Sequence, residues 1–232
     1  MSDYILHLAD NALVLGHRNS EWTGHGPILE QDIALSNIAL DLIGQSRNLY
    51  QYAAELIGNE TTEDSLAYLR RPEEYKNNLI VEQTNGHWGK TILRQFLFSA
   101  YQYPLYEHLS GQPDENLSAI AKKSIKEVTY HLRWSSEWVI RLSQGTEVSN
   151  EKMKDALIKL WPFTEDLLSN VENEVKQKWH QRVIEVFKIA GLNIPKDVVM
   201  TYGGIEGKHT EHLYKMLEEM QHLQRTYPGV EW

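Results

Sequence analysis

The 232-residue sequence contains no cysteine. Disulfide bonds, thiolate nucleophiles and cysteine-ligated metal centres are therefore excluded, and any metal would need histidine and carboxylate ligands. Basic residues are also few, since 23 Lys and Arg stand against 32 Asp and Glu and give a net charge of −9. We do not expect a nucleic acid as principal partner, because neutralising phosphates requires clustered Lys and Arg.

Long apolar runs are absent as well. No stretch approaches the length needed to span a bilayer, and the first 17 residues lack the basic and continuous hydrophobic regions of a signal peptide. Their apolar residues are interrupted by Asp3, His7, Asp10 and Asn11. The sequence therefore predicts a cytoplasmic protein with no membrane partner.

Helical periodicity dominates the rest of the chain. Apolar residues recur at intervals of three and four, which is typical of amphipathic helices. This pattern predicts helices over residues 3–21, 28–57, 88–110, 118–142, 149–171, 175–191 and 207–225. Residues 58–86 break the pattern and are too acidic and irregular to belong to the core, apart from a short helix near 66–69.

A long crossover between two helical hairpins is typical of ferritin-like bundles. We therefore predict an all-α, ferritin-like four-helix bundle with additional carboxyl-terminal helices. The whole chain, 1–232, should form a single domain, with the core bundle at about 3–145 and a helical layer at about 146–232.

The predicted helix over 118–142 carries a carboxylate and an imidazole on its apolar face. Glu127 and His131 lie four residues apart, so their side chains project together. Burying them without partners would be costly. They must therefore pair with a metal, with each other, or with a cation from another helix.

A di-iron carboxylate bundle takes one Glu from each of two helices and a Glu-x-x-His from each of the other two. Bridging carboxylates neutralise the two cations, and imidazoles complete their coordination. Here glycine and tyrosine stand where the two histidines are needed, and the third helix offers no carboxylate. The candidate positions of this degenerate site are Asp10, Asp41, Gly44, Arg94, Glu127, Tyr130 and His131. We predict no catalytic residue and no metal ligand among them, with Arg94 as the compensating cation.

Two further patterns have competing interpretations. The helix over 28–57 is apolar over most of its circumference and should be buried. Its polar residues form either a narrow solvated stripe or a seam facing the bundle interior; they are Glu30, Asn37, Asp41, Gly44, Gln45 and Asn48.

The second pattern, Glu206-Gly207-Lys208-His209, is a literal Glu-x-x-His without a second copy, so capping or an interface role is favoured over metal binding.

Long collinear segments resemble the C subunits of the bacterial phenylacetyl-CoA epoxidase (the PaaC family). They include RNSEWTGHGPILEQDIALSNIALDLIGQSRNLYQYAAEL at 18–56, KSIKEVTYHLRWSSEWVIRL at 123–142, KLWPFTEDL at 159–167 and GKHTEHLYKMLEEMQHLQRTYPGVEW at 207–232. The resemblance implies a ferritin-like subunit of a monooxygenase that epoxidises the aromatic ring of phenylacetyl-CoA.

In that family a separate A subunit holds the di-iron centre and binds the substrate, and a reductase supplies electrons from NADPH. The resemblance implies that this chain carries no cofactor of its own and supports the A subunit, with the small B subunit as a further candidate partner. Three alternatives stay open at this point. They are a di-iron oxygenase using Asp10, Asp41, Glu127 and His131 as unusual ligands with Tyr130 as a further candidate, a generic helical binding module, and a homodimer in isolation.

Overall fold

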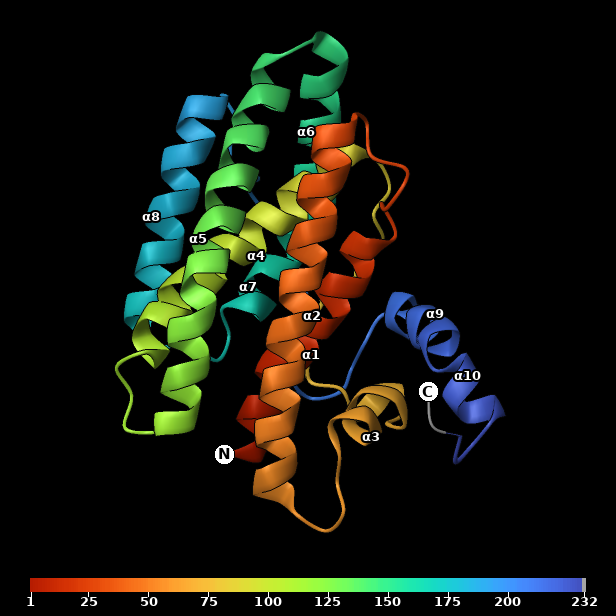
Figure 1. The fold of residues 1–232 in the computed structure, drawn as a ribbon. Coiled ribbons are helices and arrows are strands. Elements are labelled where there is room, and N and C mark those ends of the chain that lie inside the picture. Colours follow the sequence, from red (N-terminus) through yellow and green to blue (C-terminus); the bar gives the residue numbers. More distant parts are fainter. Residues whose placement is uncertain (231–232) are drawn as a thin grey trace.

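The computed structural model describes residues 1–230, which form helices and no β-strand (Figure 1). The four long helices are α1 (Ser2–Ser20), α2 (Leu29–Ile57), α4 (Trp88–Leu109) and α5 (Glu115–Gln144). α1 lies along α2, and α4 lies along α5. Each pair is joined by a short connection, so the two helices of a pair run antiparallel. The architecture is that of a ferritin-like four-helix bundle, as predicted.

Shorter helices complete the molecule. In the crossover they are α3 (Glu63–Tyr68) and the 3₁₀ turn η1 (Pro72–Glu74). After the bundle follow α6 (Glu147–Leu160), η2 (Trp161–Phe163), α7 (Thr164–Leu167), α8 (Asn173–Ala190), α9 (Glu211–Met220) and α10 (His222–Thr226). α6 and α8 pack against α4 and α5. Within residues 1–230, no helix has the length and apolar character required to cross a membrane.

Local sequence explains where these helices begin and end. Asp114 accepts a hydrogen bond from Leu117 N at 2.9 Å and so caps α5, which ends before Gly145. The helix predicted over 149–171 is instead divided into α6, η2 and α7, because Pro162 cannot donate a backbone hydrogen bond. The helix predicted to begin at residue 207 begins at Glu211, with Thr210 as its cap.

The expectation that α2 is buried is wrong for its outer side. α4 is buried on nearly every side, whereas α2 exposes Leu29, Ile33 and Leu40 along its outer side. The six polar residues predicted to form a stripe on α2 are likewise mostly exposed or half-buried. Only Gln45 among them is buried, while Glu30, Asn37 and Gly44 are exposed, so the stripe is largely a solvated face.

The expectation that the crossover lies outside the core is also wrong. Tyr75, Ile80, Val81 and Glu82 are fully buried. The backbone around them bonds to α1, where Asn78 N donates to Asn11 Oδ1 at 2.9 Å. The crossover is therefore enclosed by α1 on one side and by the carboxyl-terminal segment on the other, which Figure 1 shows lying beside α3.

Candidate functional site

Where α2 and α5 meet, two carboxylates each accept a hydrogen bond from a side chain of the other helix. His131 Nε2 donates to Asp41 Oδ2 at 2.9 Å, and Gln45 Nε2 donates to Glu127 Oε2 at 2.8 Å. The His131 side chain is fully buried, and that of Asp41 is 34% exposed. Glu127 and His131 thus share one face of α5, as predicted, but each takes its partner from α2.

Amides extend this polar interior toward α4. Gln102 Nε2 donates to Gln45 Oε1 at 2.9 Å, so Gln45 links α4 to Glu127 on α5. Further along α4, Asn19 Nδ2 donates to Gln95 Oε1 at 2.7 Å, and Gln95 donates to Ser99. Most of these contacts join neutral amides and a hydroxyl, which carry no charge that a metal would have to balance.

Asp10 lies apart from these pairs and has its own cation. Its carboxylate accepts from Tyr50 Oη at 2.5 Å, from Lys76 N at 2.7 Å and from both terminal nitrogens of Arg70. Burial, followed by the Asp10 charge, raises the pKa of Tyr50 well above its ordinary value, so the phenol keeps its proton and donates.

Burial alone would lower the pKa of Arg70. The charge and hydrogen bond of Asp10, together with Tyr50 and Tyr75, outweigh burial and raise the pKa above its ordinary value. The Arg70 guanidinium also lies over the Tyr75 ring, 4.2 Å from the ring centroid. The Asp10 carboxylate is thus enclosed in a cage of three donor residues, Tyr50, Lys76 and Arg70.

Arg94 does not have the role predicted for it. The fully buried guanidinium donates to Gln83 O, to Asn85 Oδ1 at 2.6 Å and to Asn19 Oδ1 at 3.3 Å, and it contacts no carboxylate among residues 1–230. Burial, with the charge of Arg18, lowers the pKa of Arg94 to about 9, so it remains charged at neutral pH. Its contacts tie the end of the crossover to α4.

Two further candidate positions face outward. A Cβ built on Gly44 would have no neighbour within 4 Å, and Gly44 is exposed. Tyr130 is also on the surface, with the Arg133 guanidinium 5.9 Å from its ring centroid. Neither position points into the bundle, so neither replaces an inward ligand.

The donor set does not fit a di-iron centre. Across the described residues 1–230, no three His, Asp or Glu side chains come together closely enough to hold a metal ion. The carboxylates at the candidate positions are instead divided between the α2–α5 contact and the Asp10 cage. We therefore derive no chemical step through iron in this chain.

Two buried carboxylates, Glu82 and Asp166, bond the crossover to the carboxyl-terminal region, and the sequence does not reveal these contacts. Glu82 accepts from His209 Nδ1 at 2.9 Å and from Thr210 N at 2.7 Å. Asp166 accepts from Leu79 N and from the amides of Gly203 and Gly204. The Glu-x-x-His pattern signals His209, but not that its partner is Glu82, 127 residues away.

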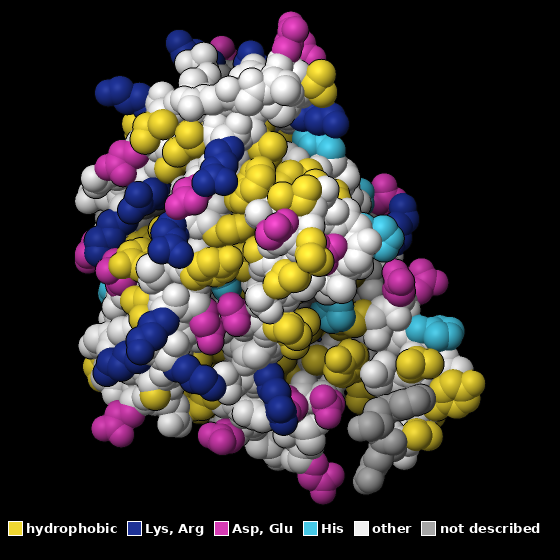
Figure 2. All heavy atoms as spheres, turned by 45° about the horizontal axis from the view of Figure 1, so that its top comes forward, with side chains coloured by type: hydrophobic (Ala, Val, Ile, Leu, Met, Phe, Trp, Pro, Cys, Tyr) yellow, Lys and Arg dark blue, Asp and Glu magenta, His cyan; other side chains and the backbone are white. Residues whose placement is uncertain are grey.

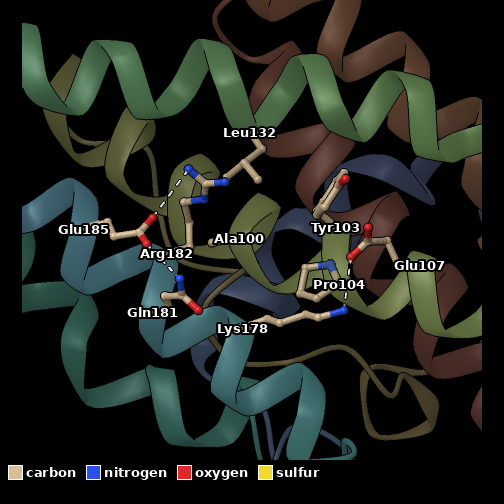
Figure 3. A pocket seen from close by; sticks show the side chains of 9 residues that line it. All are labelled: Ala100, Tyr103, Pro104, Glu107, Leu132, Lys178, Gln181, Arg182 and Glu185. Atoms are coloured by element: carbon tan, nitrogen blue, oxygen red, sulfur yellow. Dashed lines mark hydrogen bonds and ion pairs between the residues drawn. The ribbon is translucent and has the colours of Figure 1, made fainter.

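A small pocket of about 170 Å³ lies between α4, α5 and α8, and Figure 3 shows the side chains that line it. Its charged side chains are paired, since Lys178 lies 3.5 Å from Glu107 and Arg182 lies 3.9 Å from Glu185. Typical ligand pockets occupy roughly 300–1,000 Å³, so this one is too small to hold an acyl-CoA.

The chain is similar to known proteins over its whole length. The family model described as "Phenylacetic acid catabolic protein" matches residues 1–232. A protein of Escherichia coli (strain K12), described as the C subunit of 1,2-phenylacetyl-CoA epoxidase, is 44% identical over 246 residues, covering 100% of this chain and 99% of that protein. The chain therefore belongs to the phenylacetic acid catabolic protein family.

Proposed function

We propose that this chain is a non-catalytic structural subunit of a phenylacetyl-CoA ring epoxidase, and that it supports a separate catalytic A subunit. The observation that carries the proposal is the separation of its interior carboxylates. Asp10 is bound by Arg70, Asp41 by His131 and Glu127 by Gln45. Each carboxylate is engaged by a protein donor, so the fold is stable without the cations that such a bundle would otherwise need.

The division of labour in this proposal is the one that the resemblance to the PaaC family implies. The A subunit would hold the di-iron centre and the CoA ester, and the reductase would supply electrons from NADPH. This chain would contribute a rigid helical body against which the A subunit is held, with the small B subunit as a further partner. The name of the E. coli relative, which describes it as one subunit of an epoxidase, supports the assignment to such a complex.

Metal analysis tests the proposal directly. The chain is purified alone and after co-expression with the A subunit encoded in the same genome, and iron is measured per polypeptide. We expect a stable complex whose iron is accounted for by the A subunit, and far less than one iron per polypeptide when this chain is purified alone.

The contrary result would favour an oxygenase with unusual ligands. Stoichiometric iron in the isolated chain, lost in an Asp41→Ala, His131→Ala variant that still folds, would overturn the proposal. Turnover of phenylacetyl-CoA by the isolated, iron-reconstituted chain supplied with electrons would have the same meaning. Failure to associate with the A subunit would instead favour a helical binding module with another partner.

A further inference from the structure

The outer side of α2 presents an apolar stripe to solvent. Leu29, Ile33 and Leu40 are 72%, 51% and 67% exposed. With Asn37 and Gly44 they follow intervals of four, four, three and four residues, which place all five on one side of the helix. In Figure 2 hydrophobic side chains gather in the middle of the face that is turned toward the viewer.

The shape of this stripe suits another helix. It spans 15 residue steps, or about 22 Å at 1.5 Å per residue. Gly44 has no side chain, and a Cβ built there would have open space around it. An approaching helix would therefore meet projecting aliphatic side chains, with gaps between them at Asn37 and Gly44. Side chains of one helix packing into such gaps on another are the usual basis of helix–helix contact.

Positive charge borders the stripe on the side of α5. Lys122, Lys123, Lys126 and Arg133 are exposed, and none of the four forms an ion pair with any residue in 1–230. In Figure 2, Lys and Arg side chains lie to the left of the hydrophobic region, on the side where Figure 1 places α5. These four cations are therefore available to an acidic partner, although the chain as a whole has a net charge of −9.

The register of the two helices places two of these cations beside the stripe. The pairs Asp41–His131 and Gln45–Glu127 show that α2 and α5 run antiparallel at this level. Lys126 and Arg133 flank that same stretch of α5, level with Leu40 and Gly44. A partner covering the stripe would therefore find positive charge along one edge.

A second copy of this chain fits that edge poorly. Residues 29, 33, 37, 40, 44 and 47 of α2 contain Arg47 and no carboxylate. Stacking two α2 stripes would bury the apolar side chains but bring no carboxylate of the stripe itself to Lys126 or Arg133. Of the carboxylates beside the stripe, Asp41 is already paired with His131 and Glu30 lies in the first turn of α2. The charge pattern favours a different chain.

We propose that the outer face of α2 docks an amphipathic helix of a different chain, apolar along its contact stripe and carrying Asp or Glu along the edge that faces α5. This inference rests on the proposed function, in which this chain associates with a second protein of the complex. It identifies the surface through which the A subunit would be held.

Two isoleucine substitutions of equal chemistry test the surface. Ile33→Arg places a cation in the stripe, whereas Ile184→Arg does so on α8, where the isoleucine is 53% exposed. Both variants are co-expressed with the A subunit, checked for unchanged melting temperature, and compared by pull-down and binding titration. We expect Ile33→Arg to weaken the complex by about tenfold or more, since a charge is buried without a partner, and Ile184→Arg to bind as the wild type does.

A charge-reversal variant, Lys126→Glu with Arg133→Glu, should weaken binding while leaving the fold intact. If Ile33→Arg, Leu40→Arg and the charge reversal all bind like the wild type, the A subunit does not bind at the outer face of α2, although the proposed structural role stands. If the wild type itself does not bind the A subunit, the proposed function fails instead. If the stripe variants abolish only self-association, the occupant is a second copy and the inference is overturned.

Discussion

Asp10 shows how a fully buried carboxylate is balanced without a metal. Its partner Arg70 lies 60 residues away, and no helical pattern links the two. The side chains are 0% and 11% exposed, so water screens their attraction little. Removing one member of such a pair leaves an uncompensated charge in the interior. The resulting loss of folding free energy is larger than the stability that the intact pair contributes.

We therefore expect Arg70→Met to lower the free energy of unfolding by about 3–5 kcal/mol. Asp10→Asn combined with Arg70→Met should recover part of this loss, because the amide can still accept from Lys76 N. Urea denaturation of the single and double variants measures both effects. Arg71→Met is the control, since Arg71 is exposed and its ion pair with Glu74 is worth little. A loss in Arg70→Met no larger than in the control would contradict the cage.

Removing the Glu127 side chain should destabilise the fold less than removing Arg70. It is half-buried and accepts from Gln45, so Glu127→Ala should cost about 1 kcal/mol and lower the melting temperature. The control is Glu137→Ala on the exposed side of α5, which should change the melting temperature little. Equal melting temperatures for the two variants would mean that the Gln45 contact carries no stability.

At the scale of elements, the long helices could be predicted because their signal is local. An apolar residue every three or four positions predicts α1, α2, α4 and α5 to within a few residues at each end. The rotation of α2 could not be predicted so closely, because neighbouring helical positions differ by 100°. Gly44 therefore faces solvent, while Gln45 faces Glu127.

The burial of the crossover could not be predicted, because it depends on contacts that are distant in the sequence. Its backbone amides bond to Asp10 and Asp166, and its side chain Glu82 bonds to His209. Polar residues and irregular backbone indicate a surface loop only when such partners are lacking. For the same reason the sequence points to Arg94, on a long helix, as the compensating cation, whereas the structure assigns that role to Arg70.

Close backbone approach fixes the carboxyl-terminal segment on the crossover. A Cβ at Gly207, where φ is +75°, would meet Glu73 O, whereas a Cβ at Gly191, where φ is +69°, would meet nothing. Gly191→Ala should cost about 1–2 kcal/mol from backbone strain alone. Gly207→Ala should cost clearly more and expose α9 to proteolysis. Limited proteolysis and urea denaturation compare the two, and equal costs would mean that the segment does not dock this closely.

His209 makes this docking dependent on pH. Its two ring nitrogens face Glu82 Oε2 and Tyr75 O, both at 2.9 Å, and both oxygens accept hydrogen bonds. Burial lowers the pKa of His209, but the hydrogen bond and charge of Glu82, the Tyr75 carbonyl and the charge of Asp10 outweigh it. The pKa is therefore raised above its ordinary value. The protonated ring stabilises the fold fully below the ordinary pKa, and this stabilisation is lost as pH rises through the raised pKa.

The unfolding free energy of the wild type should thus exceed that of His209→Gln by more near pH 6 than at about pH 9. Denaturation across this range measures the difference. His222→Gln is the control, since His222 is exposed on α10. A wild-type advantage that does not change with pH would show that His209 is neutral in the fold.

On the scale of the whole molecule, charge is unevenly distributed. The chain has a net charge of −9, yet α5 presents Lys122, Lys123, Lys126 and Arg133 beside the apolar stripe of α2. An acidic protein with one basic border approaches an acidic partner in a preferred orientation. Exposed charges of this kind act mainly on the rate of association and are screened by salt.

Association with the A subunit should consequently slow as salt is raised, while dissociation changes less. Neutralising the border with Lys126→Gln and Arg133→Gln should lower the association rate at low salt and flatten its salt dependence. Lys152→Gln with Lys154→Gln, two exposed positions on α6, is the matched control and should leave the dependence as in the wild type. Stopped-flow or surface-based kinetics provide the rates. If the border and control variants respond to salt alike, the charges of α5 do not steer the partner, and the complex forms through apolar contact alone.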